Sequence, residues 1–350
     1  MSRIVAMASI LQRRYPWTQA PLVINGPMGG FAGPELAASV TNAGGLGFIA
    51  GGYDLSKLPG QVAEFRKLVP SNNGAVLPVG LGFLCFGCSI DDAVEVIAET
   101  KPAAAWLFAA NNHADYAPWA QRIRAASPDT AIWIQTGSVA AALEIARTAK
   151  PDALVMQGLD AGGHGLEKGA SIISLLPEAA DALQEAGFDA IPLAAAGGIV
   201  DARGAAAALT LGASGVVMGT RFLASSEVKH PGYQRAILAG QDGGQVTTRS
   251  KVFDEAKAEG NNWPVLYDGR GLVNKTYEDF IGGKTIEEVR KLHGEALKGK
   301  DAGFGEEEKR VTIWAGTGIG LVRDVLPAGK IVEEVREGVK KVLGNLQAQV

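Results

Sequence analysis

Cysteine, aromatic residues and long apolar runs are all scarce in this chain of 350 residues. Its two cysteines, Cys85 and Cys88, are too few for a disulfide-stapled scaffold of this size, which favours a reducing compartment. No apolar run reaches the roughly 18 residues that cross a bilayer, and the N-terminus does not resemble a signal peptide. We therefore expect a soluble, cytoplasmic protein.

A marked excess of charge of one sign is also absent. The chain has 33 Lys and Arg against 37 Asp and Glu, which gives a formal net charge of −4, and the basic residues are scattered. This distribution argues against binding to nucleic acid or to an anionic membrane, so we expect a small-molecule partner. The CxxC spacing of Cys85 and Cys88 lacks the further ligands that zinc or an iron–sulfur cluster needs, and no metal site is predicted.

Hydrophobic residues make up 47% of the chain, which also contains 46 glycines, and short apolar runs alternate with longer Ala-rich segments. Eight strands are predicted, at about 21–26, 45–51, 75–83, 103–110, 131–137, 153–158, 192–198 and 215–219. Helices are predicted between them, at 34–43, 55–68, 91–100, 115–126, 138–149, 173–187 and 203–212. Parallel strands buried on both faces read as such continuous apolar runs, and eight βα units predict a (β/α)8 TIM barrel. A doubly wound sheet is less favoured, because PMGGFAGPE after the first strand lacks the dinucleotide fingerprint.

The alternation ends near Phe222, which suggests three parts. We predict a barrel over 15–222, a smaller, mainly helical appended domain or lid over 223–310, and a C-terminal segment over 311–350 that returns to the barrel. The return is indicated by an apolar, Gly-rich stretch at 311–323 and by a helix over 331–343, which places Ile331, Val335, Val339 and Val342 on one face. Apolar surface on the appended helices would allow a homodimer.

Glycine dominates the ends of the predicted strands, which is where the active site of such a barrel lies. Gly197 and Gly198 follow the seventh strand, and Gly219 and Thr220 follow the eighth. Loops at these two places commonly bind phosphate through backbone N–H groups, and Asp201 is placed to cap the next helix. The alternative is that the glycines only make tight turns.

The loop after the sixth strand, QGLDAGGHGLEKG, holds one histidine, His164, among glycines. A neutral imidazole at the barrel mouth can remove a weakly acidic C–H proton, so His164 is the candidate base; the alternative is a surface histidine without a role. His113, after the fourth strand, is the next candidate, whereas His230 and His293 lie in the appended region and are expected to be solvated or structural.

Several segments, read in order, resemble the nitronate monooxygenases, formerly called 2-nitropropane dioxygenases: INGPMGG, AGGLGFIAGG, QGLDAGGHG, AAAGGIVDARG and LGASGVVMGTRFLAS. The resemblance covers about residues 20–225, and IWAGTGIG resembles the family's C-terminal segment. It implies an FMN-dependent oxidoreductase, with His164 as the catalytic histidine. It places the FMN phosphate at Gly197, Gly198, Gly219 and Thr220, and further FMN contacts at Pro27, Met28, Gly29, Gly80, Gln135, Gly162 and Gly163.

The activity that the resemblance implies is oxidation of nitronates or nitroalkanes by O2 to a carbonyl compound and nitrite. In that chemistry His164 removes the α-proton of a nitroalkane, or a nitronate anion binds directly, and the flavin takes the electrons. Some relatives have Lys where Gln135 stands and Asn where Gly80 stands, which leaves the flavin potential and the substrate open. TTRSKVFDEAK and NNWPVLYDGRGLVN resemble a branch-specific appended region, in which Tyr267, like Trp314 further on, could line a lid or belong to the core.

Other functions fit the same barrel. An FMN-dependent NAD(P)H:quinone reductase or enoyl-[acyl-carrier-protein] reductase shares a similar AGGH loop and is the main alternative. A non-catalytic flavin-binding barrel is the second. An enzyme like IMP dehydrogenase would need a cysteine in the loop of His164, and a Schiff-base aldolase would need a lysine at a strand end; neither is present.

Overall fold

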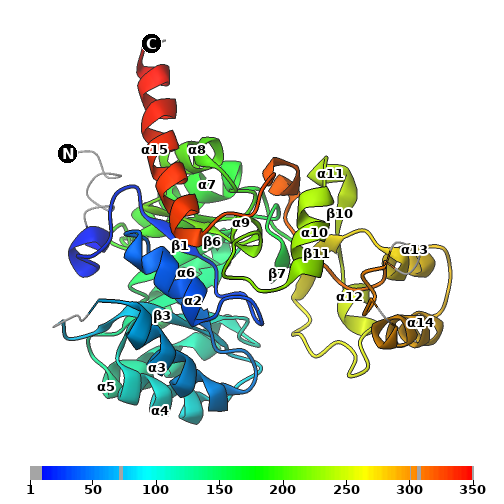
Figure 1. The fold of residues 1–350 in the computed structure, drawn as a ribbon. Helices are drawn as coiled ribbons and strands as arrows, with labels where there is room; N and C mark the ends of the chain where they lie inside the picture. The colour runs from blue at the N-terminus through cyan, green and yellow to red at the C-terminus, as the bar shows by residue number, and fades with distance from the viewer. Residues whose placement is uncertain (1–9, 71–73, 300, 306–308, 349–350) are drawn as a thin grey trace.

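The computed structural model describes residues 10–70, 74–299, 301–305 and 309–348. Within these ranges eight parallel strands form one sheet that curves into a barrel, in the order β1-β9-β8-β6-β5-β4-β3-β2 (Figure 1). The strands are β1 (Val23–Asn25), β2 (Phe48–Ala50), β3 (Leu77–Leu84), β4 (Pro102–Phe108), β5 (Ala131–Thr136), β6 (Ala153–Gln157), β8 (Leu193–Ala196) and β9 (Gly215–Met218). Each lies at a predicted position, and the predicted (β/α)8 fold is confirmed.

The barrel closes where β1 meets β2, and little backbone pairing joins these two strands. A single parallel bridge joins Ile24 to Leu46. The Asn25 side chain completes the seam: its Oδ1 accepts a hydrogen bond from the Phe48 N–H at 2.9 Å, and its Nδ2 donates to the Phe48 carbonyl at 2.8 Å. Because Asn25 is fully buried, its amide replaces the two ladder bonds that neighbouring strands would otherwise make.

Helices cross back over the outside of the barrel between the strands, as predicted. They are α2 (Pro34–Asn42), α3 (Leu58–Leu68), α4 (Ile90–Thr100), α5 (Tyr116–Ala126), α6 (Val139–Thr148), α7 (Ile172–Glu185) and α8 (Ala202–Thr210). The C-terminal helix α15 (Ala328–Gln347) packs against α2 and α8, and its last turns project beyond the barrel (Figure 1). Its buried side chains include Ile331, Val335 and Val339, three of the four residues predicted to share a face.

Large aromatic side chains fill the barrel interior beside very small neighbours. Phe48, Trp106 and Trp133 are buried there among alanines. A Cβ added to Gly80 would lie 2.1 Å from the Phe48 ring, so this ring occupies the space that a side chain at position 80 would need. Gly80 therefore serves interior packing.

The segment after the barrel combines short helices with a small sheet. The helices are α9 (Thr220–Leu223), α10 (Pro231–Ala239), α11 (Gly243–Val246), α12 (Val252–Glu255), α13 (Lys275–Ile281) and α14 (Ile286–Lys298), and α9 spans the predicted boundary at 222. The antiparallel sheet joins β10 (Thr247–Ser250), β11 (Tyr267–Leu272) and β7 (Gly163–Leu166), in the order β10-β11-β7. These three strands are missing from the sequence prediction, because TTRS, YDGRGL and GHGL are polar and Gly-rich and lack apolar alternation.

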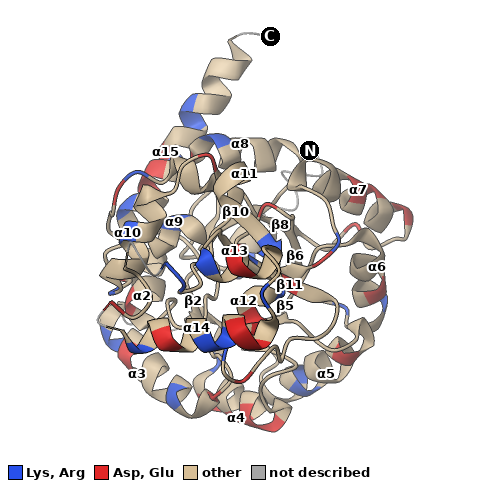
Figure 2. Cartoon of the chain, turned by 90° about the vertical axis from the view of Figure 1, so that its right-hand side faces the viewer, with Lys and Arg blue, Asp and Glu red and all other residues tan. Residues whose placement is uncertain are grey.

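The appended segment covers one end of the barrel. In Figure 2 the barrel helices α2 to α8 form a ring, and α12, α13 and α14 lie in front of its centre. Figure 1 shows the same helices beyond one end of the strands. No helix in the described part of the chain has both the length and the apolar composition needed to cross a bilayer.

Candidate functional site

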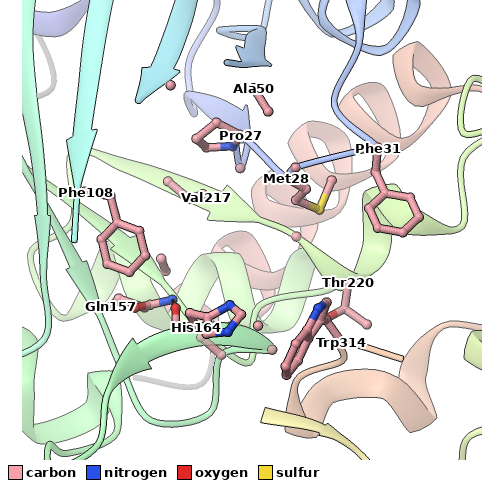
Figure 3. Close-up of a pocket in the computed structure, with 18 of the residues that line it drawn as sticks. Pro27, Met28, Phe31, Ala50, Phe108, Gln157, His164, Val217, Thr220 and Trp314 are labelled. Atoms are coloured by element: carbon pink, nitrogen blue, oxygen red, sulfur yellow. Dashed lines mark hydrogen bonds between the residues drawn. The ribbon is translucent and has the colours of Figure 1, made fainter. Parts of the chain in front are cut away.

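A cavity of about 470 Å³ lies between the carboxyl ends of the barrel strands and the appended segment. This volume is in the range of small-molecule sites, which are commonly found at this end of such barrels. Phe108, Met28 and Val217 come to it from three different strands or their loops, while His164 and Trp314 form the opposite side (Figure 3). The cavity is therefore built jointly by the barrel and the segment that covers it.

Eleven of the twelve predicted site residues line this cavity. They are Pro27, Met28, Gly29, Gln135, Gly162, Gly163, His164, Gly197, Gly198, Gly219 and Thr220. The twelfth, Gly80, does not, and its predicted place in the site needs correction. Its position faces Phe48 inside the barrel, whereas Gly82, two residues further along β3, lies on the lining. Side chains alternate along a strand, so these two positions share a face but differ in depth.

The loops after β8 and β9 offer unpaired backbone donors to the cavity. Gly197 and Gly198 have φ values of +108° and +72°, which favour glycine. In the described ranges no residue accepts a hydrogen bond from the backbone N–H of Gly198 or Gly219. The predicted cap is confirmed: Asp201 accepts hydrogen bonds from the N–H groups of Arg203 and Gly204 at the start of α8. Because Asp201 occupies that helix end, an anion would bind to the glycine loops themselves.

Gln135 is the penultimate residue of β5 and lines the cavity. Its Oε1 accepts a hydrogen bond of 2.9 Å from the indole N–H of Trp106, which fixes the orientation of the amide. Within the described residues nothing accepts a hydrogen bond from its Nε2, so this donor remains available to a ligand. The residue is 8% exposed, and a polar group so nearly buried needs a partner.

His164 lies on β7, opposite Gly269 of β11. Its Nε2 is 2.8 Å from Oδ2 of Asp254 on α12, and its ring stacks on Trp263 with centroids 3.6 Å apart and planes 7° apart. No described residue forms a hydrogen bond with Nδ1, and the ring lines the cavity between Gln157 and Trp314 (Figure 3). One ring nitrogen is thus held by a carboxylate, and the other is free to act on a ligand.

Burial keeps the ring of His164 neutral. Burial lowers the pKa of His164 below the ordinary 6.5, and the hydrogen bond and charge of Asp254 offset only part of this effect. Burial raises the pKa of Asp254, but the contacts with His164 and Lys257 outweigh it and the pKa is lowered overall. At neutral pH the pair is therefore an imidazole with its Nε2–H donated to a carboxylate.

The match to known sequences identifies the family. The model of the family described as nitronate monooxygenase matches residues 16–77 and 85–338. The chain belongs to the nitronate monooxygenase family. It is 41% identical to "Nitronate monooxygenase npaC" of Metarhizium robertsii, over 97% of each chain. It is 36% identical to a nitronate monooxygenase of Neurospora crassa, over 95% of this chain and 93% of that one. As a member of this family, the protein is an oxidoreductase that acts on a small molecule.

A solved structure agrees on the fold. The structure of FabK from Thermotoga maritima superposes with a TM-score of 0.76 at 24% identity, over 97% of this chain and 98% of that one. At this identity the likeness concerns the fold alone.

The lining of the cavity fits the flavin that nitronate monooxygenases use. A Cβ on Gly29 or Gly163 would meet no protein atom within 4 Å, so these glycines leave room beside the ring of a planar cofactor. The free N–H groups of Gly198 and Gly219 suit a phosphate, and Gln135 Nε2 suits an acceptor on the ring. In the described part of the chain no group of three His, Cys, Asp or Glu side chains is arranged to hold a metal ion.

Asp254, Lys257 and Trp263 are site residues that the sequence prediction missed. Asp254 bonds to His164, Lys257 Nζ lies 2.7 Å from Asp254 Oδ1, and Trp263 covers the imidazole. All three lie in TTRSKVFDEAK or NNWPVLYDGRGLVN, the stretches already recognised as branch-specific. The resemblance of these stretches to a branch-specific region was the one sign that they matter to the site. Nothing in their spacing shows that the segment folds back onto a loop 90 residues earlier.

The remaining aromatic and histidine candidates divide into one that lines the cavity and four that do not. Trp314 lines the cavity, and its ring packs where a Cβ on Gly269 would lie, 2.4 Å away. Tyr267 is buried, and its ring packs edge-on against Phe108 at 5.4 Å. His113 contacts Glu144 and lies outside the lining, as do His230 and His293. Of the four histidines, all of which the structure describes, His164 alone lines the cavity.

Proposed function

We propose that the protein oxidises nitronates and nitroalkanes with O2, with FMN as cofactor, and releases a carbonyl compound and nitrite. The observation that carries this proposal is a neutral imidazole, His164, with an unbonded Nδ1 in a cavity of about 470 Å³ that combines unpaired backbone donors with apolar walls. Membership of the nitronate monooxygenase family supports the reaction class.

FMN would be held from three sides. Gly197, Gly198, Gly219 and the Thr220 hydroxyl would bind the phosphate, and that hydroxyl already accepts a 3.0 Å hydrogen bond from the Gly316 N–H. The bound flavin would supply the electron acceptor for the reaction. Gln135 would contact the ring, and Gly29 and Gly163 would admit it without a clash.

The protein residues would handle the proton and the charge. Nδ1 of His164 would take the α-proton of a nitroalkane, and the imidazolium that forms would be stabilised by the Asp254 carboxylate at 2.8 Å. A nitronate anion needs no such step. Lys257, which lines the cavity, would contribute positive potential beside the nitronate, whether it forms in the site or binds as the anion.

Substitution of His164 tests this assignment. For His164→Asn we expect kcat/KM with a nitroalkane to fall by about 10²- to 10⁴-fold, because the general base is lost. Turnover of the pre-formed nitronate and the visible flavin spectrum should persist. His113→Asn, outside the cavity, is the matched control and should behave as wild type.

The assay also separates the alternatives. Anaerobic bleaching of the bound flavin by an alkyl nitronate, and not by NADH, is the expected result. Bleaching by NADH alone would favour a reductase, and full nitroalkane turnover in His164→Asn would overturn the role of the base. Purified protein that takes up no FMN would overturn the cofactor assignment.

A further inference from the structure

Asp254 is a buried carboxylate that contacts His164 and does not itself line the cavity. It lies on the four-residue helix α12, with Val252 and Phe253 before it packed into a small core with Val289. Only 2% of Asp254 is exposed to solvent. A carboxylate is costly to bury unless it is paired, so its two partners explain why it is tolerated there.

Those two partners bind different oxygens of the carboxylate. Oδ2 accepts from His164 Nε2 at 2.8 Å, and Oδ1 accepts from Lys257 Nζ at 2.7 Å. An ionised carboxylate only accepts hydrogen bonds, so the proton of the neutral imidazole must be on Nε2. Nδ1, with which no described residue forms a hydrogen bond, is then the unprotonated nitrogen. The opposite tautomer would point a lone pair at the carboxylate and carry the proton on Nδ1.

The packing around the ring restricts its rotation. Trp263 stacks on one face at 3.6 Å, and Trp314 lies at 4.6 Å with its plane tilted by 55°. Only 11% of the His164 side chain is exposed. A flip of the ring would exchange its nitrogen and carbon positions and break the bond to Asp254 without replacing it, so the stack and the carboxylate favour one orientation together.

We propose that Asp254 is a positioning residue for His164, which fixes the Nε2–H tautomer and so presents an unprotonated Nδ1 to the substrate. Lys257 supports this role by holding the carboxylate ionised. The inference rests on the proposed function of His164 as a base. When Nδ1 takes the α-proton, the substrate becomes the nitronate and the imidazolium keeps its Nε2–H on Asp254.

The direct test reads the tautomer in the FMN-loaded wild-type protein. Two-dimensional ¹H–¹⁵N NMR of the histidine rings, with His164→Asn used to assign the signals, should show a protonated Nε2 and an unprotonated Nδ1 at neutral pH. A protonated Nδ1 would overturn the proposal. This measurement does not depend on turnover, so it holds whatever substrate the enzyme prefers.

Asp254→Asn provides the kinetic test, because an amide can turn its NH2 towards Nε2 and favour the wrong tautomer. We expect kcat for a nitroalkane to fall by about 10²-fold, while the pre-formed nitronate stays within about 3-fold of wild type. Asp254→Glu should recover part of the loss. Asp279→Asn is the matched control: this carboxylate of the same segment pairs with Lys284 and Arg310 and lies outside the cavity.

The outcomes separate this inference from the function it rests on. If His164→Asn abolishes nitroalkane turnover but Asp254→Asn does not, the positioning role is wrong and the base survives. An equal loss of kcat with nitronate and with nitroalkane in Asp254→Asn would show that Asp254 only maintains the structure, which also overturns the proposal. Full nitroalkane turnover in His164→Asn would instead remove the base, and the NMR result would still decide the tautomer.

Discussion

At the scale of single residues, two opposing effects act on the His164 imidazole. Burial lowers its pKa, and the hydrogen bond and charge of Asp254 raise it, while Lys257 and Arg249 add smaller lowering effects. The net pKa lies below the ordinary 6.5. A base acts in its deprotonated form, which predominates above its pKa, so the ring stays competent at mildly acidic pH.

The lowered pKa of His164 predicts how the reaction depends on pH. The kcat/KM for a nitroalkane should fall towards acidic pH with a midpoint below the ordinary 6.5, because protonation of His164 removes the base. Initial rates between pH 5 and 8, in buffers of constant ionic strength, would measure it. The enzyme must be shown to remain folded at each pH. A fall in kcat/KM centred well above pH 6.5 would contradict a pKa lowered by burial.

Among the residues, glycine loops and the histidine were predictable, and the partners of the histidine were not. Position after a strand is a local property, so Gly197, Gly219 and His164 could be placed at the cavity from the pattern alone. Asp254 and Trp263 reach it only through the fold of a segment without clear periodicity. Gly80 was assigned to the site through the family resemblance alone, which does not give its depth along β3.

At the scale of elements, the seam between β1 and β2 depends on one side chain. Asn25→Ala would leave the N–H and the carbonyl of Phe48 without their partners in a buried strand. We expect the free energy of unfolding to fall by about 2–5 kcal/mol, measured by urea denaturation. Asn42→Ala removes one exposed hydrogen bond to Leu68 and should cost less than about 1 kcal/mol. Equal losses in the two variants would argue against the role of Asn25 in closure.

The two sheets differ in how well their strands can be predicted from the sequence. Barrel strands such as β4 and β5 are buried along their length, so they appear in the sequence as apolar runs. β7, β10 and β11 form a sheet that carries buried charge, including the Arg249–Asp268 pair, and no apolar pattern marks it. A strand that is stabilised by its neighbours and not by its own composition cannot be found from local sequence.

At the scale of the whole molecule, the cavity joins two parts of the chain. Its walls include Gly198 and Gly219 from the barrel, and Lys257 and Trp263 from the appended segment. Gly162 sits at the junction, where a Cβ would lie 2.4 Å from the backbone of Ala315 and Gly316. The homodimer stays a prediction, with Ile281 on α13 63% exposed.

A ligand that contacts both parts should stabilise both. Addition of FMN to the apo protein at about 100 times its Kd should raise the free energy of unfolding by roughly 2.7 kcal/mol, seen as a higher Tm. Hydrogen exchange in β11 and β9 should slow together. Riboflavin carries the same ring without the phosphate, so at equal concentration it should raise Tm less, because the N–H groups of Gly198 and Gly219 would lack their anion. Identical shifts for FMN and riboflavin would mean that the glycine loops do not bind the phosphate.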